Sequence, residues 1–268
     1  MTIKSALILA ALQGITEFIP ISSSGHLIVL QNFLKLKDVP ILFDLILHLG
    51  TVLATIIVYH KIIGNILFDL FLWIKGGKID RGNVKLFFYI LISTFITGIL
   101  GYAFKDILKD FFYQPDIVPL FLILTGIILL TTRFVHTGKK EISQINIIYP
   151  VVIGGTQAFS MLPGISRSGS TISAGLFMGS SRGFSGIYSF LVSIPSIFGA
   201  SLFEFLSTRS QLHGYMGSGL YFLAFLTSFL TGYGALRLLL RFLTRGKLYI
   251  FSIYCFLAGI AGLIIYYY

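Results

Sequence analysis

The chain has 268 residues, of which 56% are hydrophobic and only 11% are charged, and its mean hydropathy is +0.90. Soluble domains carry roughly 25% charged residues, so this composition argues against a soluble enzyme, a disordered chain and a nucleic-acid-binding domain. The net charge of +10 is better explained by cytoplasmic loops and membrane lipid headgroups than by a nucleic-acid partner. The composition indicates a multi-pass protein of the cell membrane.

Six stretches of the sequence are apolar over about the 20 residues that a membrane-spanning helix needs. They are 41–63, 86–104, 117–135, 187–206, 219–243 and 248–268. The sequence lacks the alternation of polar and apolar residues that membrane-spanning strands require. We therefore expect an all-α polytopic membrane protein with six transmembrane helices.

Two further apolar stretches, 5–34 and 147–180, are each interrupted by a polar turn, at 22–26 and at 163–171. Each stretch reads as a short helix, a turn and another short helix. This pattern is typical of a re-entrant helical hairpin, whose irregular backbone must be buried in protein or line a wet cavity. The fold expected from the sequence is therefore six transmembrane helices plus two re-entrant hairpins.

Positive charge gathers in three connecting segments, 64–85, 133–146 and 237–247. The positive-inside rule places these segments in the cytoplasm. The first hairpin then enters from the outer face of the membrane and the second from the cytoplasmic face. Both halves, approximately 1–135 and 145–268, read as one hairpin plus three spans in opposite orientation. This is an inverted-topology repeat within one membrane domain that covers the whole chain.

A comparison of the chain with itself supports the repeat. Aligning Gln13 with Gln157 also aligns Ser22 with Ser166, and the similarity is confined to the two hairpins. We therefore expect the two polar turns to meet in the membrane interior.

Polar and charged groups at membrane depth are costly and usually mark a function. Gln13 and Glu17 are four positions apart and share one face of a helix. Arg167 offers a planar fork of donors suited to phosphate or carboxylate oxygens, and half-helix N-termini add backbone N–H groups. We expect one anionic ligand here. A serine hydroxyl could attack it with Glu17 or His26 as the base, and a carboxylate beside an amide could hold a hard divalent cation.

Two motifs of the chain resemble those of a known family. Residues 13–17, Gln-Gly-Ile-Thr-Glu, fit the pattern [E/Q]-x-x-x-E. Residues 163–171 fit the pattern P-G-x-S-R-S-x-x-T, and the turn at 22–26 resembles the family's serine–histidine turn. In these motifs, in their spacing and in its length, the chain resembles the membrane-integral undecaprenyl-diphosphate phosphatases, also called the bacitracin-resistance protein family.

The resemblance implies removal of the terminal phosphate of undecaprenyl diphosphate, which recycles the lipid carrier of cell-wall synthesis and confers bacitracin resistance. It implies dependence on a divalent cation, Mg or Ca, an active site open to the outer face and a possible homodimer. It makes Glu17 and Arg167 essential, Ser23 the expected nucleophile and His26 a base or acid, although either Ser23 or His26 could form the covalent bond. The expected substrate-binding residues are Gln13, Ser22, Ser24, Ser166, Ser168 and Thr171. Many relatives have Glu where this chain has Gln13, so Glu17 is the expected metal ligand.

Less specific interpretations stand beside these. Arg167 could simply neutralise Glu17, and His48 and His60 are interpreted as hydrogen-bonded packing residues. A lipid-phosphate flippase or anion transporter would use the same inverted repeat and the same arginine. A transporter has no need of a nucleophile beside a base, so the serine, glutamate and histidine of the first hairpin discriminate the two functions.

Overall fold

Helices form the regular structure of the protein, and strands are absent from the residues that the structure describes, which are 1–36, 39–112, 114–135, 138–208 and 217–267. The structure is a computed structural model. The helices of the first half are α1 (Ile3–Phe18), α2 (Ser23–Phe33), α3 (Ile41–Val58), α4 (His60–Ile74), α5 (Arg81–Ala103), α6 (Lys105–Phe112) and α7 (Val118–Thr131). Those of the second half are α8 (Ile148–Phe159), α9 (Arg167–Phe177), α10 (Arg182–Thr208), α11 (Ser218–Thr244) and α12 (Phe251–Tyr267). The all-α expectation is confirmed.

Within the described residues, five helical segments are long and apolar enough to cross a membrane, which agrees with a multi-pass membrane protein. They are Ile41–Val58, Arg81–Ala103, Arg182–Leu206, Ser218–Thr244 and Leu248–Tyr266. The remaining predicted span, 117–135, corresponds to α7 with the 3-10 turn that follows it. Together these form the shorter apolar segment Val118–Phe134. The number of six spans stays a prediction.

One predicted span differs from the structure. The sequence suggests a continuous helix over 41–63, whereas α3 ends at Val58 and α4 begins at His60. Helix α4 then continues to Ile74, into the segment 64–85 that was expected to be a loop. The physical reason is that apolar residues recur up to Ile74 despite Lys61 and Asp69, and the cluster of basic residues begins only at Lys75. Helix α4 uses these apolar residues to pack along α5.

The two polar turns are helix N-caps, and each is built on a serine. The Ser22 hydroxyl accepts a hydrogen bond from the backbone N–H of Gly25 (3.3 Å), and that of Ser166 accepts one from Gly169 (3.1 Å). Such caps satisfy N–H groups that the first turn of a helix leaves free. The chain therefore breaks and restarts as a helix in both places, which separates α1 from α2 and α8 from α9.

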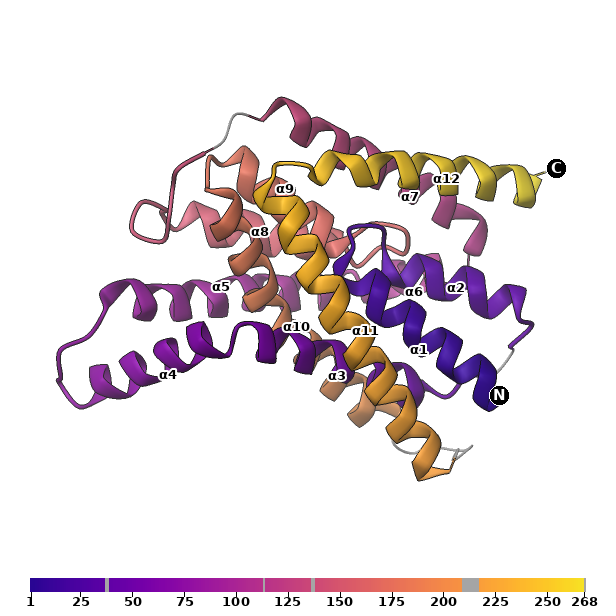
Figure 1. Cartoon of the computed structure of the whole chain (residues 1–268), viewed down its shortest axis with the longest axis horizontal. Coiled ribbons are helices and arrows are strands. Elements are labelled where there is room, and N and C mark those ends of the chain that lie inside the picture. The colour runs from indigo at the N-terminus through magenta and orange to yellow at the C-terminus, as the bar shows by residue number, and fades with distance from the viewer. Residues whose placement is uncertain (37–38, 113, 136–137, 209–216, 268) are drawn as a thin grey trace.

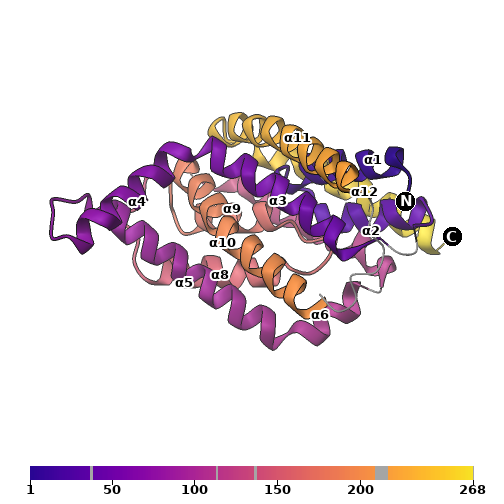
Figure 2. The ribbon, with the colours of Figure 1, turned by 90° about the horizontal axis from the view of Figure 1, so that it is seen from below.

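The helices pack in pairs that recur in the two halves. Helix α1 packs against α11 and α8 against α5, while α3 packs against α11 and α10 against α5. Helices α7 and α12 run side by side, as do α3 and α10 (Figures 1 and 2). Exchanging α1 with α8, α3 with α10, α5 with α11 and α7 with α12 reproduces these principal pairs. Two pairs break the pattern around the short helices: α9 packs closely on α7 and on α10, whereas close packing of α2 on α12 or on α3 is absent from the described part.

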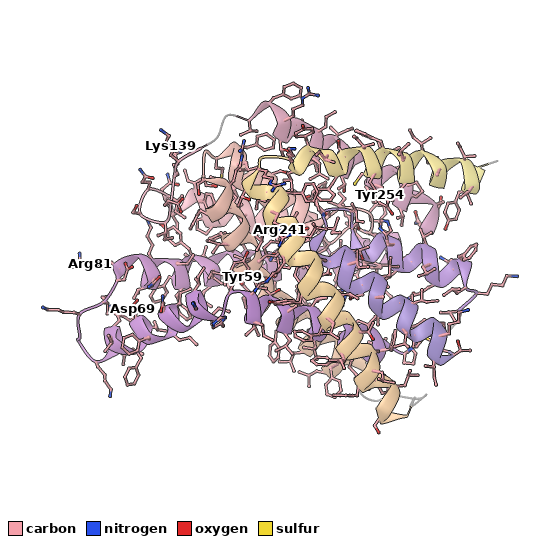
Figure 3. All side chains as sticks on the ribbon, in the orientation of Figure 1. Tyr59, Asp69, Arg81, Lys139, Arg241 and Tyr254 are labelled. Carbon is pink, nitrogen blue, oxygen red and sulfur yellow. The ribbon has the colours of Figure 1, made fainter. Side chains whose placement is uncertain are left out.

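The molecule has two ends. Both termini lie at one end, and the connection between α4 and α5 lies at the other (Figure 1). Asp69, Arg81 and Lys139 are found at this second end, in segments that the sequence assigns to the cytoplasm (Figure 3). Helix α1 begins near the end that holds the termini and α8 begins toward the other end, and the turns that follow these helices contact each other (Figure 1).

Candidate active site

Glu17, in the last turn of α1, is the centre of a polar cluster. Its Oε1 accepts a hydrogen bond from Nη2 of Arg167 at 2.6 Å, and its Oε2 accepts one from Oγ of Ser23 at 2.8 Å. The carboxylate is 8% exposed, so water screens this ion pair poorly. Arg167 and Glu17 are separated by 150 positions in the chain. The structure thus brings the two motifs together, as the sequence predicts.

The positions of these side chains follow from the helix ends. Ser23 is the first residue of α2 and Arg167 the first residue of α9, so both project from the turns where the two helix pairs meet. Gln13 lies one turn before Glu17 on the same face of α1, and its Nε2 donates to Glu17 Oε2 at 3.0 Å. The cluster therefore rests on the starts of two helices and the end of a third.

The turns also contact each other through serine hydroxyls. The N–H of Gly164 donates to Ser22 Oγ (3.1 Å), and Ser168 Oγ donates to the carbonyl of Phe18 (3.1 Å). Gly164 has a φ of +102°, and a Cβ there would lie 2.6 Å from the carbonyl oxygen of Val118. Only glycine fits this approach without strain.

Several residues expected to bind phosphate have structural contacts as well. The side chains of Ser22, Ser166, Ser168 and Thr171 are all buried. Thr171 donates to the carbonyl of Arg167 (2.8 Å) and is 2.6 Å from the hydroxyl of Ser189, while Ser24 lies 3.4 Å from Ser22 Oγ. These hydroxyls fix the turns, and their direct contact with a phosphate stays a prediction.

His26 faces away from the Glu17 cluster. Its Nδ1 lies 2.7 Å from the carbonyl oxygen of Ser22, which only accepts, so Nδ1 carries the proton. In the neutral ring, Nε2 then accepts from the hydroxyl of Tyr254 at 2.7 Å. Within the described part of the chain, His26 forms no hydrogen bond with Ser23 or Glu17. Of the two candidate bases, Glu17 bonds the Ser23 hydroxyl in this structure, and the role of His26 in catalysis stays a prediction.

His48 belongs to the cluster although the sequence suggested a packing role. Its Nδ1 lies 2.8 Å from Gln13 Nε2 and 3.7 Å from Glu17 Oε2. The available signal was a polar side chain within the otherwise apolar span that became α3. His60, by contrast, is exposed and bonds only the carbonyl of Ile57 in its own chain segment (2.8 Å).

Two buried polar atoms of the cluster have no partner among the described residues: Nη1 of Arg167 and Oε1 of Gln13. An unsatisfied buried donor or acceptor costs about 1–3 kcal/mol, so both atoms point to a ligand. The free donor of Arg167 suits a phosphate oxygen. The Gln13 amide contacts Glu17 through its nitrogen, and its free oxygen is of the type that hard cations bind.

The polar cluster around Glu17 offers few metal ligands, and this limits how a divalent cation can bind there. The described residues contain no group of three or more His, Cys, Asp or Glu side chains able to hold a metal ion. Glu17 and Gln13 offer one carboxylate and one amide oxygen. Mg ions commonly bind through one or two carboxylates, with substrate phosphates and water completing the ligands. The cluster therefore suits a cation that is bound together with a phosphate.

A cavity of about 640 Å³ opens beside the first turn, where α2 does not pack closely on α12. Its wall is mostly apolar and includes Gly25, His26, Leu30, Tyr254, Ala258 and Ile265. The His26–Tyr254 hydrogen bond links α2 to α12 at this cavity. Tyr254 lies on the half of the molecule remote from the charged end (Figure 3). The cavity has space for a long apolar chain, and its lining includes Gly25 and His26, which follow Ser23 closely in the chain.

Residues 6–261 match the family described as bacitracin resistance protein BacA. A protein of Treponema denticola named undecaprenyl-diphosphatase is 38% identical over 100% of this chain and 98% of its own length. One of Alkaliphilus metalliredigens with the same name is 38% identical over 97% of both chains. One of Methanococcus vannielii, also so named, is 37% identical over 95% of this chain and 96% of its own.

Proposed function

The chain belongs to the bacitracin resistance protein BacA family, and on this premise we propose that it is an undecaprenyl-diphosphatase of the membrane. It hydrolyses undecaprenyl diphosphate to undecaprenyl phosphate and inorganic phosphate. The observation that carries this proposal is the contact of one carboxylate, Glu17, with both a serine hydroxyl and an arginine from a second hairpin. A transporter needs no hydroxyl activated by a base, so this geometry does not favour the flippase or anion-carrier alternative.

We propose that Ser23 is the nucleophile. Its hydroxyl already donates to Glu17 Oε2, so Glu17 accepts the proton as the Ser23 oxygen bonds to the terminal phosphorus. The anhydride P–O bond on that phosphorus breaks, and undecaprenyl phosphate leaves. Water then cleaves the phosphoserine and releases inorganic phosphate, and the Ser23 hydroxyl is restored. His26 is the second candidate, but its acceptor nitrogen is occupied by Tyr254.

The substrate binds at two sites, a polar site for its diphosphate and an apolar site for its isoprenoid chain. Arg167 Nη1 and the N-termini of α2 and α9 bind the diphosphate, since helix N-termini present free N–H groups to anions. We propose that the cavity between α2 and α12 holds the isoprenoid units next to the diphosphate. Burial of their methyl and methylene groups there contributes about 0.8 kcal/mol for each CH2.

We propose that Glu17 and Gln13 Oε1 hold a divalent cation, Mg or Ca, together with the substrate. When bound, such a cation offsets the negative charge of the transferred phosphoryl group. Arg167 orients the diphosphate beside Ser23, and Glu17 holds the proton that the serine gives up. Gln13 is 0% exposed and its Oε1 has no partner among the described residues, so this oxygen is available to a cation.

We further propose that α1–α2 and α8–α9 are re-entrant hairpins of an inverted-topology repeat in the cell membrane. The exchange symmetry of the packed helix pairs and the opposite entry of the two hairpins support this. Two of the three basic segments, 64–85 and 133–146, have Arg81 and Lys139 at the end remote from the termini (Figure 3), which supports a first hairpin and an active site open to the outer face. A homodimer also remains a proposal, which light scattering of the detergent-solubilised protein tests.

The experiment that tests the function uses the purified full chain in detergent with Mg or Ca. Undecaprenyl diphosphate is supplied, inorganic phosphate is measured and the lipid product is identified by its mass. The proposal predicts equal amounts of phosphate and undecaprenyl phosphate. Movement of the intact lipid across liposomes without phosphate release contradicts it and supports the transporter.

A further inference from the structure

The amide of Gln13 lies between Glu17 and His48, and its orientation can be deduced. An ionised carboxylate only accepts hydrogen bonds, and the 2.6 Å contact with Arg167 keeps Glu17 ionised. The nitrogen of the Gln13 amide must therefore be the atom that faces Glu17. This same Nε2 lies 2.8 Å from Nδ1 of His48 and gives its second hydrogen to that atom. Both hydrogens of the amide are thus used.

The orientation of Gln13 sets the tautomer of His48. Because Nδ1 of His48 accepts a hydrogen bond, the proton of the neutral imidazole is on Nε2. In the described part of the chain this Nε2–H has no hydrogen-bond partner, and the side chain is 32% exposed. This nitrogen is not among the buried polar atoms that lack a partner, so a ligand or water can reach it. His48 therefore presents an accessible donor beside the Glu17 cluster.

Helix α3 holds His48 rigidly. The neighbouring side chains Leu47 and Thr51 are 0% and 1% exposed, and Thr51 donates to the backbone carbonyl of His48 (2.8 Å). Gly50 allows α3 to approach α11 so closely that a Cβ would lie 2.8 Å from the carbonyl oxygen of Phe225. A donor on such a rigid element holds its position, as a binding site requires.

We propose that His48 is a phosphate-binding residue, whose Nε2–H donates to an oxygen of the bound diphosphate. It acts with the free Nη1 of Arg167, so the diphosphate site extends from the two hairpins onto α3. Gln13 is a positioning residue, because it selects the tautomer that leaves a donor on the exposed nitrogen. This inference rests on the proposed function for the identity of the ligand, but the geometry of the three side chains is independent of it.

Three substitutions separate the two nitrogens of the imidazole. His48→Gln places an amide donor near the position of Nε2–H. His48→Asn keeps an acceptor near the position of Nδ1, so Gln13 stays bonded, but removes the distal donor. His48→Leu removes both. His60→Leu is the matched control, because His60 is an exposed histidine at the start of α4 that bonds only a carbonyl of its own segment.

The readouts are KM and kcat on undecaprenyl diphosphate and the affinity for pyrophosphate, measured from the thermal shift that pyrophosphate causes. We expect His48→Asn and His48→Leu to raise KM and weaken pyrophosphate binding about tenfold, the size of one charge-assisted hydrogen bond. We expect His48→Gln to stay within about threefold of the wild type, and His60→Leu to match it. Melting temperatures without ligand should be alike for His48→Asn and the wild type.

Wild-type affinity in His48→Asn, or a His48→Gln variant as weak as His48→Leu, overturns the inference. If the wild-type protein binds pyrophosphate through His48 but releases no phosphate from the lipid, the proposed function fails and this inference stands. If the wild-type protein releases phosphate from the lipid and His48→Asn binds pyrophosphate as tightly as the wild type, the proposed function stands and this inference fails. The pyrophosphate measurement needs no turnover, so the two failures are distinguishable.

Discussion

Arg167 and Glu17 form an ion pair of 2.6 Å that joins the second hairpin to the first. Glu17 is buried and the Arg167 side chain is 16% exposed, so each charge depends on the other for compensation. Removing one partner of such a pair typically costs about 3–5 kcal/mol, because the other charge is left buried. The pair therefore both holds the hairpins together and fixes the charges beside Ser23. Variants of the cluster must for this reason be compared per mole of folded protein.

Replacing Glu17 with glutamine should nearly abolish turnover. The amide has the size of the carboxylate but cannot accept the Ser23 proton, so kcat should fall by about 10²–10⁴. Gln157→Leu is the control for a buried polar change, since Gln157 lies on α8 at the position that aligns with Gln13 and bonds Thr97 and Ser196 instead of Glu17. The steady-state rate of phosphate release measures both variants. Equal losses of kcat in the two variants would show that Glu17 has no specific role in the reaction.

Ser23→Ala should lower kcat by at least about 100-fold, because the hydroxyl that bonds Glu17 is the proposed nucleophile. Thr244→Ala, in which the lost hydroxyl bonds only carbonyls of its own helix, should match the wild type. Rapid quenching of a reaction with substrate labelled at the terminal phosphate, in acid to preserve phosphoserine and in alkali to preserve phosphohistidine, should trap the label on Ser23. Label on His26 would assign the covalent step to the histidine.

Filling the cavity should impair the lipid substrate selectively. Ala258→Phe places a ring into the space between α2 and α12, and we expect KM for undecaprenyl diphosphate to rise about tenfold, since several buried CH2 groups lose their place. Pyrophosphate binding should not change. Leu257→Phe, on the adjacent 65% exposed position of α12, is the control. An equal effect of both substitutions on KM would argue against a chain in this cavity.

Removal of divalent cations should stop turnover. We expect a chelator to reduce phosphate release to background and added Mg or Ca to restore it. Gln13→Leu removes the free amide oxygen, so the cation concentration needed for half-maximal activity should rise about tenfold or more. Full activity in the chelator, with metal analysis showing no bound ion, would exclude the proposed cation.

Gly164→Ala should destabilise the protein strongly. The φ of +102° and the contact with the Val118 carbonyl both disfavour a side chain, and together they cost at least about 1–3 kcal/mol. Gly155→Ala, in α8 with no atom within 4 Å of its Cβ, should leave the melting temperature unchanged or raise it. Thermal unfolding in detergent compares them. Equal melting temperatures would mean that the tight turn is not formed.

The helix breaks and the meeting of Glu17 with Arg167 could be predicted from the sequence, because polar turns interrupt two apolar stretches and the charge pattern gives them opposite orientations. The position of His48 beside Glu17 could not be predicted from the sequence. It lies on a separate span, and the sequence does not show which face of that span turns toward the hairpins. The direction of His26 depends on Tyr254, 228 positions away, which no local pattern reveals. The start of α4 was missed because apolar residues flank His60 and Lys61 on both sides, so the hydropathy pattern fits one span.

The most direct test of the central claim is phosphate release from undecaprenyl diphosphate by the wild-type protein and by Arg167→Ala, with circular dichroism to confirm equal helix content. Arg167 is proposed to bind the diphosphate beside Ser23 while pairing with Glu17. The account predicts stoichiometric release by the wild type and a loss of at least about 100-fold in the variant. Undiminished release by a folded Arg167→Ala protein would contradict it.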